Sequence, residues 1–257
     1  MFGAMLAAWR ARRGLSQLAL ALAARVSSRH LSFLETGRAR PSAEMVLRLA
    51  SVLGLGLPDQ NDLLAAAGFE RRFPEARTLS AEVSAVLTQI MRVHEPYPLV
   101  VLDASYEVRD LNRASKNLFG SLLGRTPTAP NLLALLFDPE GLRPFVVGWD
   151  ALAERLLSRL RREMWMAPRD ARLAQLSSRL LAFPGVPVLS FDPHRLEATL
   201  PLRLDVDGTT LSFVTTMTTF SNAHDVLVSE LRIESFYPLD ALTEAHCRES
   251  ARHSVGL

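Results

Sequence analysis

The stretch that most constrains this chain is residues 16–41, SQLALALAARVSSRHLSFLETGRARP. Ser16 and Ser27 each stand just before a short run with helical spacing, and serine is a preferred residue at a helix N-cap. Gly37 follows the second run, and glycine commonly ends a helix. The spacing therefore predicts two short helices joined by a tight turn, with the second helix polar where it begins.

Three further helices are predicted around this pair. Residues 3–13 have helical spacing before it, and two more helices follow it, each with a proline near its first turn. In the first helix of the pair, we expect Leu18 and Leu22 to pack into the core. Together these five short helices predict one all-α domain over residues 1–70.

The pattern of the sequence changes after residue 70. Residues 71–94 predict a charged linker and a bridging helix, residues 95–240 a second domain, and residues 241–257 a polar tail. The second domain begins with two predicted strands and ends with three, with helical segments between them. The whole chain is thus predicted to be α+β, with a five-stranded antiparallel sheet that has helices inserted. The predicted strands span 98–103, 106–112, Leu200–Val206, Leu211–Phe220 and Leu231–Pro238, and Asp207-Gly208 is a strong hairpin signal between the third and fourth.

Charge and cysteine content narrow the class of protein. Residues 1–77 hold 11 Arg against 6 acidic residues, whereas the rest of the chain is slightly acidic. A basic N-terminal part suits contact with phosphates. The single cysteine, Cys247, allows no disulfide framework or thiolate metal site within one chain. No signal peptide or membrane-spanning run is recognised, so we expect a cytoplasmic protein with no membrane partner.

The second helix of the pair has the composition of a DNA recognition helix, which meets base edges with its N-terminal turn. Arg29 can donate two hydrogen bonds to a guanine, and Phe33 can contact a thymine methyl. Gln17 stands where a helix N-terminus approaches phosphate, and Arg38 and Arg40 follow the recognition helix. The candidate DNA-binding residues are Gln17, Ser27, Ser28, Arg29, His30, Ser32, Phe33, Arg38 and Arg40.

Residues 5–57 resemble the helix-turn-helix proteins of the phage-repressor, or xenobiotic-response-element, class. The shared pattern is Leu15-Ser16-Gln17, Leu20-Ala21, Ala24, Val26-Ser27, Leu31-Ser32, Glu35 and Gly37. Arg25 departs from it, because the class often has glycine in the turn; a non-glycine residue can adopt the left-handed conformation there at modest cost. The resemblance implies that Glu35 ties the recognition helix to a neighbouring arginine and does not contact bases.

A narrower resemblance covers nearly the whole chain. The strings SSRHLSFLETGRARPSAEMVLRLA, PLVVLDASYEVRDLNRAS, NLLALLFDP and ELRIESFYPLD are similar to regulators of the MmyB-like type. In that group the helix-turn-helix is followed by a ligand-binding domain similar to a PAS fold. The resemblance implies that the second domain senses a small, often apolar ligand.

An apolar pocket in the second domain needs apolar and aromatic walls with a few polar anchors. For any single candidate, ordinary core packing is the competing interpretation. As a set they predict a site for a fatty-acyl-like or aromatic molecule. The candidates are Phe119, Phe137, Phe145, Trp149, Met164, Trp165, Met166, Phe213 and Met217.

Motifs of enzymes are missing from the sequence. It contains no G-x-G-x-x-G after a strand, no Walker loop, no G-x-S-x-G and no H-E-x-x-H. We therefore expect no catalytic residue, no cofactor and no metal site.

The leading hypothesis is a ligand-responsive bacterial transcription regulator that binds a pseudo-palindromic operator in double-stranded DNA as a homodimer. One alternative is a helix-turn-helix used for protein interaction, as in antitoxins, with the second domain as partner surface. Another is a constitutive repressor whose second domain serves only dimerisation. A co-purifying apolar molecule would favour the sensor over both.

Overall fold

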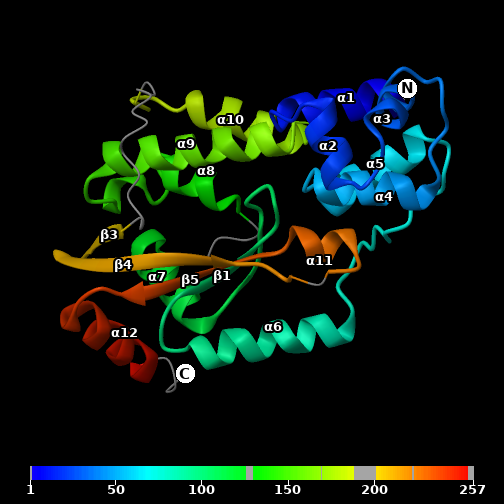
Figure 1. Cartoon of the computed structure of the whole chain (residues 1–257). Coiled ribbons are helices and arrows are strands. Elements are labelled where there is room, and N and C mark those ends of the chain that lie inside the picture. Colours follow the sequence, from blue (N-terminus) through cyan, green and yellow to red (C-terminus); the bar gives the residue numbers. More distant parts are fainter. Residues whose placement is uncertain (1, 126–129, 169, 188–200, 222, 254–257) are drawn as a thin grey trace. The chain divides into compact units, whose positions relative to one another are not determined.

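The computed structural model describes residues 2–125, 130–168, 170–187, 201–221 and 223–253. The chain forms two compact units. The first combines Met1–Leu79 with Phe220–Ser229, and the second combines Ser80–Thr219 with Glu230–Leu257. The elements of both are labelled in Figure 1.

The N-terminal part of the first unit is all-α, as predicted. Serine side chains cap three of its helices: Ser16, Ser27 and Ser42 each accept a hydrogen bond from the backbone N–H three residues on. Each cap satisfies one of the N–H groups that a helix start leaves without a partner. The five helices are α1 Phe2–Arg12, α2 Gln17–Ala23, α3 Ser28–Glu35, α4 Ala43–Val52 and α5 Leu57–Ala66.

The packing of α2 differs from the prediction. Leu18 and Leu22 are 59% and 70% exposed, whereas Leu20 and Ala21 are buried. Positions four residues apart share one face of a helix, and the face of α2 that carries Leu18 and Leu22 points to solvent. The small side chain of Ala21 lets the other face approach the core closely. The expectation that Leu18 and Leu22 enter the core was therefore wrong.

A segment from late in the chain completes the first unit. Residues 220–229 follow strand β4 (Thr209–Thr218) and include most of helix α11 (Val226–Glu230). Within the unit, the backbone N–H of Val226 donates to the carbonyl oxygen of Pro74 at 2.9 Å. The carboxylate of Asp225 accepts from the backbone N–H of Ala76 at 3.4 Å. The linker after α5 is thus fastened to a connection that the sequence assigned to the second domain.

The second unit contains the predicted five-stranded sheet, in the order β2-β1-β5-β4-β3 with every neighbouring pair antiparallel. Asp207 and Gly208 both have positive φ, the conformation of a tight hairpin turn between β3 and β4. Leu200, expected at the start of the third strand, lies outside the described residues. The strands are β1 Leu99–Leu102, β2 Val108–Leu111, β3 Pro201–Val206, β4 Thr209–Thr218 and β5 Arg232–Pro238.

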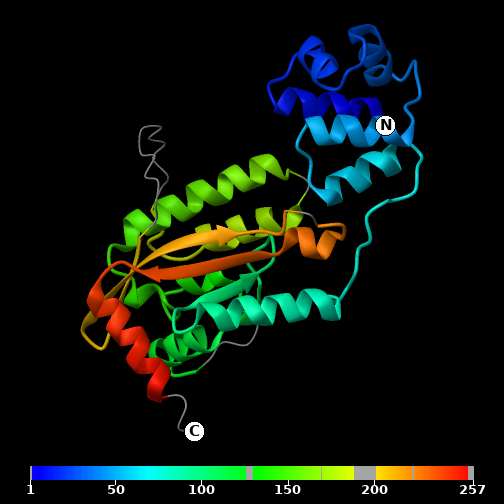
Figure 2. The ribbon, with the colours of Figure 1, turned by 60° about the horizontal axis from the view of Figure 1, so that its bottom comes forward.

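Helices come between β2 and β3 along the chain, which confirms the predicted PAS-like insertion, and helices cover both faces of the sheet. Helices α9 and α10 lie on one side of the sheet and α6 on the other (Figures 1 and 2). All four residues of β1 are buried because both of its faces are covered. The helices are α6 Ala81–His94, α7 Arg113–Leu123, α8 Leu132–Phe137, the 3₁₀ helix η1 Arg143–Phe145, α9 Trp149–Met166 and α10 Ala171–Leu181.

The end of the chain differs from the prediction of a polar tail. Residues Ala241–His253 form helix α12 instead. Thr243 and Cys247 of this helix are buried, and the Thr243 hydroxyl accepts a hydrogen bond from the backbone N–H of Ser212 in β4 at 2.9 Å. Only these few positions enter the interior, so the mostly polar sequence gives little sign that α12 packs on the sheet.

Candidate DNA interface and ligand pocket

The turn between α2 and α3 sets the direction of the recognition helix. Arg25 adopts the left-handed conformation, with φ 55°. This is the conformation expected at the position where the helix-turn-helix class often has glycine. The backbone N–H of Val26 then donates to the carbonyl oxygen of Ala21 at 2.9 Å. Ser27 is extended and caps α3 through the backbone N–H of His30 at 3.1 Å. The predicted capping role of Ser27 is confirmed.

Helix α3 presents the expected residues to solvent. Leu31 and Leu34 are fully buried, so the opposite face of the helix is open. The Arg29 guanidinium lies over the Phe33 ring, 5.4 Å from its centroid. Such a contact restrains a long side chain without using its hydrogen-bond donors. Ser27, Ser28 and Arg29 are exposed, and His30, Ser32 and Phe33 are half-buried.

A buried carboxylate joins the first three helices. Glu35 of α3 accepts two hydrogen bonds from Arg10 of α1, at 2.6 and 3.0 Å, and one from the Gln17 amide of α2 at 2.7 Å. Burial opposes the charged form, but these bonds outweigh it and hold the pKa of Glu35 below its usual range. The structural role implied for Glu35 is confirmed. Gln17 remains half-buried at the surface, and Arg38 and Arg40 are exposed beyond α3.

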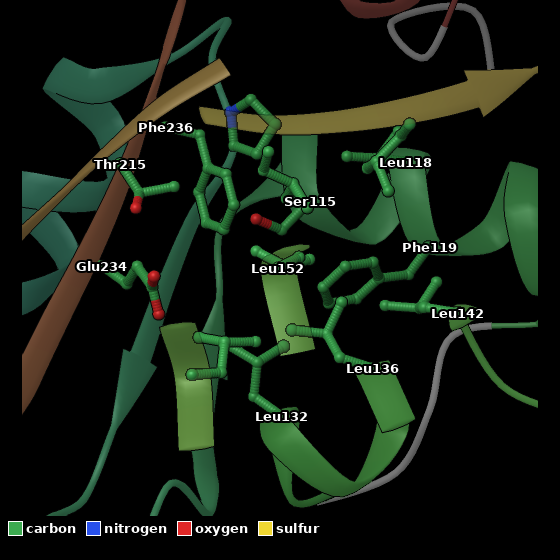
Figure 3. Close-up of a pocket in the computed structure, with 14 residues that line it drawn as sticks. Ser115, Leu118, Phe119, Leu132, Leu136, Leu142, Leu152, Thr215, Glu234 and Phe236 are labelled. Atoms are coloured by element: carbon green, nitrogen blue, oxygen red, sulfur yellow. The ribbon is translucent and has the colours of Figure 1, made fainter. Parts of the chain in front are cut away.

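The second unit contains a cavity of about 40 Å³ between the sheet and helices α7, α8 and α9. Its walls are mostly leucine, contributed by three helices, by β3 and by Leu142 in the turn after α8, with one aromatic ring from α7 and one from β5 (Figure 3). The lining residues are Pro98, Ser115, Leu118, Phe119, Leu132, Leu136, Leu142, Leu152, Leu156, Leu202, Leu204, Thr215, Glu234 and Phe236.

Three polar side chains interrupt this apolar wall. The Ser115 hydroxyl accepts from the backbone N–H of Leu99 and donates to the carbonyl oxygen of Leu99, each at 2.9 Å. It therefore fastens α7 to β1. Thr215 of β4 and Glu234 of β5 lie together on one side of the cavity (Figure 3). Burial raises the pKa of Glu234, against the attraction of Arg159 and a hydrogen bond from Thr215.

Two family models match the chain at these units. Residues 1–64 match a helix-turn-helix domain, and residues 83–249 match the MmyB-like transcription regulator ligand binding domain. The second match spans well over half of the chain. The chain belongs to the MmyB-like family. No curated protein matches it. Among the described helices, none is long and apolar enough to cross a membrane.

The MmyB-like domain places the nine predicted ligand-binding residues in different environments. Only Phe119 lines the cavity. Phe137 and Phe213 are fully buried elsewhere in the core, and Phe145, Trp149 and Met164 pack against that core while partly exposed. Met217 is half-buried near the end of β4. Trp165 and Met166 are 60% and 51% exposed, because the last turn of α9 extends past the core.

Apart from Phe119, the residues that line the MmyB-like cavity were missed, mainly because leucine in a pocket wall resembles leucine in a core. Glu234 is a lining residue that the two-residue spacing of a strand could have identified. In a strand, residues two apart share a face, so Glu234 and the buried Phe236 had to point the same way. A carboxylate on the core-facing side of a predicted strand indicates either a buried ion pair or a site.

Proposed function

We propose that this MmyB-like regulator binds a specific DNA sequence and that a small apolar molecule in its second domain sets its affinity for that sequence. The observation that carries the proposal is the leucine-lined cavity in a chain that also bears an exposed, capped recognition helix. The ligand in this proposal is fatty-acyl-like or aromatic.

The DNA contacts follow from the exposed face of α3. Arg29 chooses a base through two hydrogen bonds to guanine, with Ser27, Ser28, His30, Ser32 and Phe33 around it. Gln17, Arg38 and Arg40 contact phosphates and set the register of the domain on the duplex. A single recognition helix covers about half of an operator, so the proposal includes a homodimer on a pseudo-palindromic site.

The size of the cavity implies that the ligand widens it. Sites for drug-sized ligands enclose roughly 300–1,000 Å³, whereas this cavity is about 40 Å³. Eight leucines in the wall can change rotamer to make room. Some of the binding energy would thus be spent on moving the helices and strands that carry them.

The topology of the chain offers a route for that movement to reach the DNA-binding unit. Strands β4 and β5 contribute Thr215 and Glu234 to the cavity. Between these strands the chain runs through residues 220–229, which belong to the first unit. A ligand that shifts β4 or β5 therefore pulls on a segment that holds the linker after α5. Such a shift is a bias between two states of the regulator.

The experiment compares two arginines on the proposed DNA surface. An operator is first selected from random DNA, and binding is followed by fluorescence anisotropy at several salt concentrations. Arg29→Ala should weaken operator binding by about 1–3 kcal/mol and relax the choice of one base pair. Arg38→Ala, the matched variant, should weaken binding to all sequences and reduce the salt slope by about one.

Two outcomes would contradict the proposal. Operator binding that is unchanged by Arg29→Ala would remove α3 as the recognition helix. A chain that carries no apolar molecule in native mass spectrometry, and whose operator affinity no apolar compound changes, would remove the sensor and leave a constitutive regulator.

A further inference from the structure

Glu234 is the one charged side chain among the described residues that line the cavity. Figure 3 shows its carboxylate beside Thr215, with leucine side chains from α8 and α9 close by. A carboxylate costs free energy in apolar surroundings unless hydrogen bonds or opposite charge compensate it. The partners of Glu234 therefore decide what this side of the cavity can bind.

A neighbouring carboxylate shows how an acid in this region is normally satisfied. Glu163 of α9 accepts a hydrogen bond from the Tyr106 hydroxyl at 2.8 Å and another from Arg159 Nε at 3.2 Å. The Arg159 guanidinium also lies over the Tyr106 ring, 5.3 Å from its centroid. Arg159 thus contacts Glu163 and Tyr106 directly, and its charge also attracts Glu234.

Glu234 has a different hydrogen-bond donor from those of Glu163. Its hydrogen bond comes from Thr215, a neutral hydroxyl on the adjacent strand. The pKa of Glu234 is raised because burial outweighs the attraction of Arg159 and the hydrogen bond from Thr215. A carboxylate has about four acceptor positions, so several remain for a ligand.

We propose that Glu234, held by Thr215, is the polar anchor of the cavity and selects an apolar molecule whose polar end is an amine or a hydroxyl. Such a group donates a hydrogen bond to the carboxylate, and an ammonium also neutralises it. A ligand carboxylate would instead set two negative charges side by side in an apolar cavity. The inference rests on the proposed sensor function and narrows it, because a free fatty acid is then a poor ligand.

The test uses three probes with the same short apolar chain: hexylamine, hexan-1-ol and hexanoate. Binding to the full-length protein is measured by isothermal titration calorimetry, with thermal unfolding as a second readout. We expect hexylamine to bind about tenfold more tightly than hexanoate, with hexanol between them. In Glu234→Gln the preference for the amine over the acid should disappear, while hexanol binds within about threefold of its wild-type affinity.

Glu82→Gln is the matched control, since it removes the same charge from an exposed position on α6 of the same unit. It should leave the ranking of the probes unchanged. Hexanoate binding to the wild-type chain as tightly as hexylamine would overturn the inference, even if Glu234→Gln did not fold. A ranking that persists in a folded Glu234→Gln protein would overturn it as well.

The same data separate this inference from the proposed function. If none of the three probes binds the wild-type protein and no other apolar compound does, the sensor itself fails. If probes bind without a preference for the amine, the sensor stands and the role of Glu234 fails.

Discussion

Both units cap helices with polar side chains, but the side chains of the DNA interface and of the cavity come from different parts of the chain. In the first unit, serine caps lie at the surface, and the proposed DNA-binding residues lie in α3 or close to it in the sequence. In the second unit, Asn112 caps α7 from a buried position, and the cavity gathers side chains from α7, α8, α9, β3, β4 and β5. A DNA interface is thus visible along a short stretch of sequence. A pocket depends on elements that only folding brings together.

The largest expected effect concerns the caps. Asn112 accepts from the backbone N–H groups of Leu99 and Ser115, and its amide donates to the carbonyl oxygen of Tyr97. Asn112→Ala removes the partners of the Ser115 N–H and the Tyr97 carbonyl oxygen, while the Leu99 N–H keeps its bond to the Ser115 hydroxyl, and should destabilise the second unit by about 3 kcal/mol. Ser42→Ala at an exposed cap should cost the first unit about 1 kcal/mol. Hydrogen exchange with mass spectrometry, which reports each unit separately, measures both. Equal losses would mean that burial does not distinguish the two caps.

Two helical glycines, one in each unit, differ in the space around them. A Cβ at Gly3 would collide with the backbone carbonyl oxygens of Leu34 and Glu35, so Gly3→Ala should destabilise the first unit by about 2 kcal/mol. At Gly120, in α7, a Cβ meets nothing within 4 Å. Gly120→Ala should therefore stabilise the second unit by about 0.5–1 kcal/mol. The same exchange experiment applies, and stabilisation by Gly3→Ala would refute the close approach of α1 to α3.

The Glu35 network predicts a pH dependence in the first unit. Because the folded pKa of Glu35 is lowered, its stabilising contribution is present above the unfolded pKa of about 4.3 and is lost as pH falls through the folded pKa. Glu35→Gln should cost about 1.5 kcal/mol at neutral pH and progressively less in acid. Urea unfolding of wild type and variant between neutral pH and pH 3 measures the difference, and a constant difference would contradict the network.

The smallest expected effect concerns Cys247 of α12. Burial raises the pKa of its thiol to about 11, so little thiolate forms near neutral pH. Cys247 should react with iodoacetamide much more slowly in the folded protein than in urea, as followed by mass spectrometry. Equal rates would indicate that α12 separates readily from the sheet.

Features set by neighbours in the sequence were predicted correctly, whereas features set by the packing of distant elements were not. The predicted strands, the Asp207-Gly208 turn and the cap at Ser27 depend on neighbours in the sequence, and the structure has them. The faces that Leu18 and Leu22 present, and the helix after Asp240, depend on what other elements cover. For the same reason, eight of the nine predicted ligand-binding residues lie outside the lining of the cavity.

The sequence by itself determined the helix-turn-helix, because caps, turn conformations and the spacing of apolar residues act over a few residues. It also determined the order of strands and helices in the second domain. The tertiary structure alone decided that leucines from distant helices would surround a cavity and that Glu234 would face it beside Thr215. Packing between elements far apart in the chain sets where space remains and which polar group borders it.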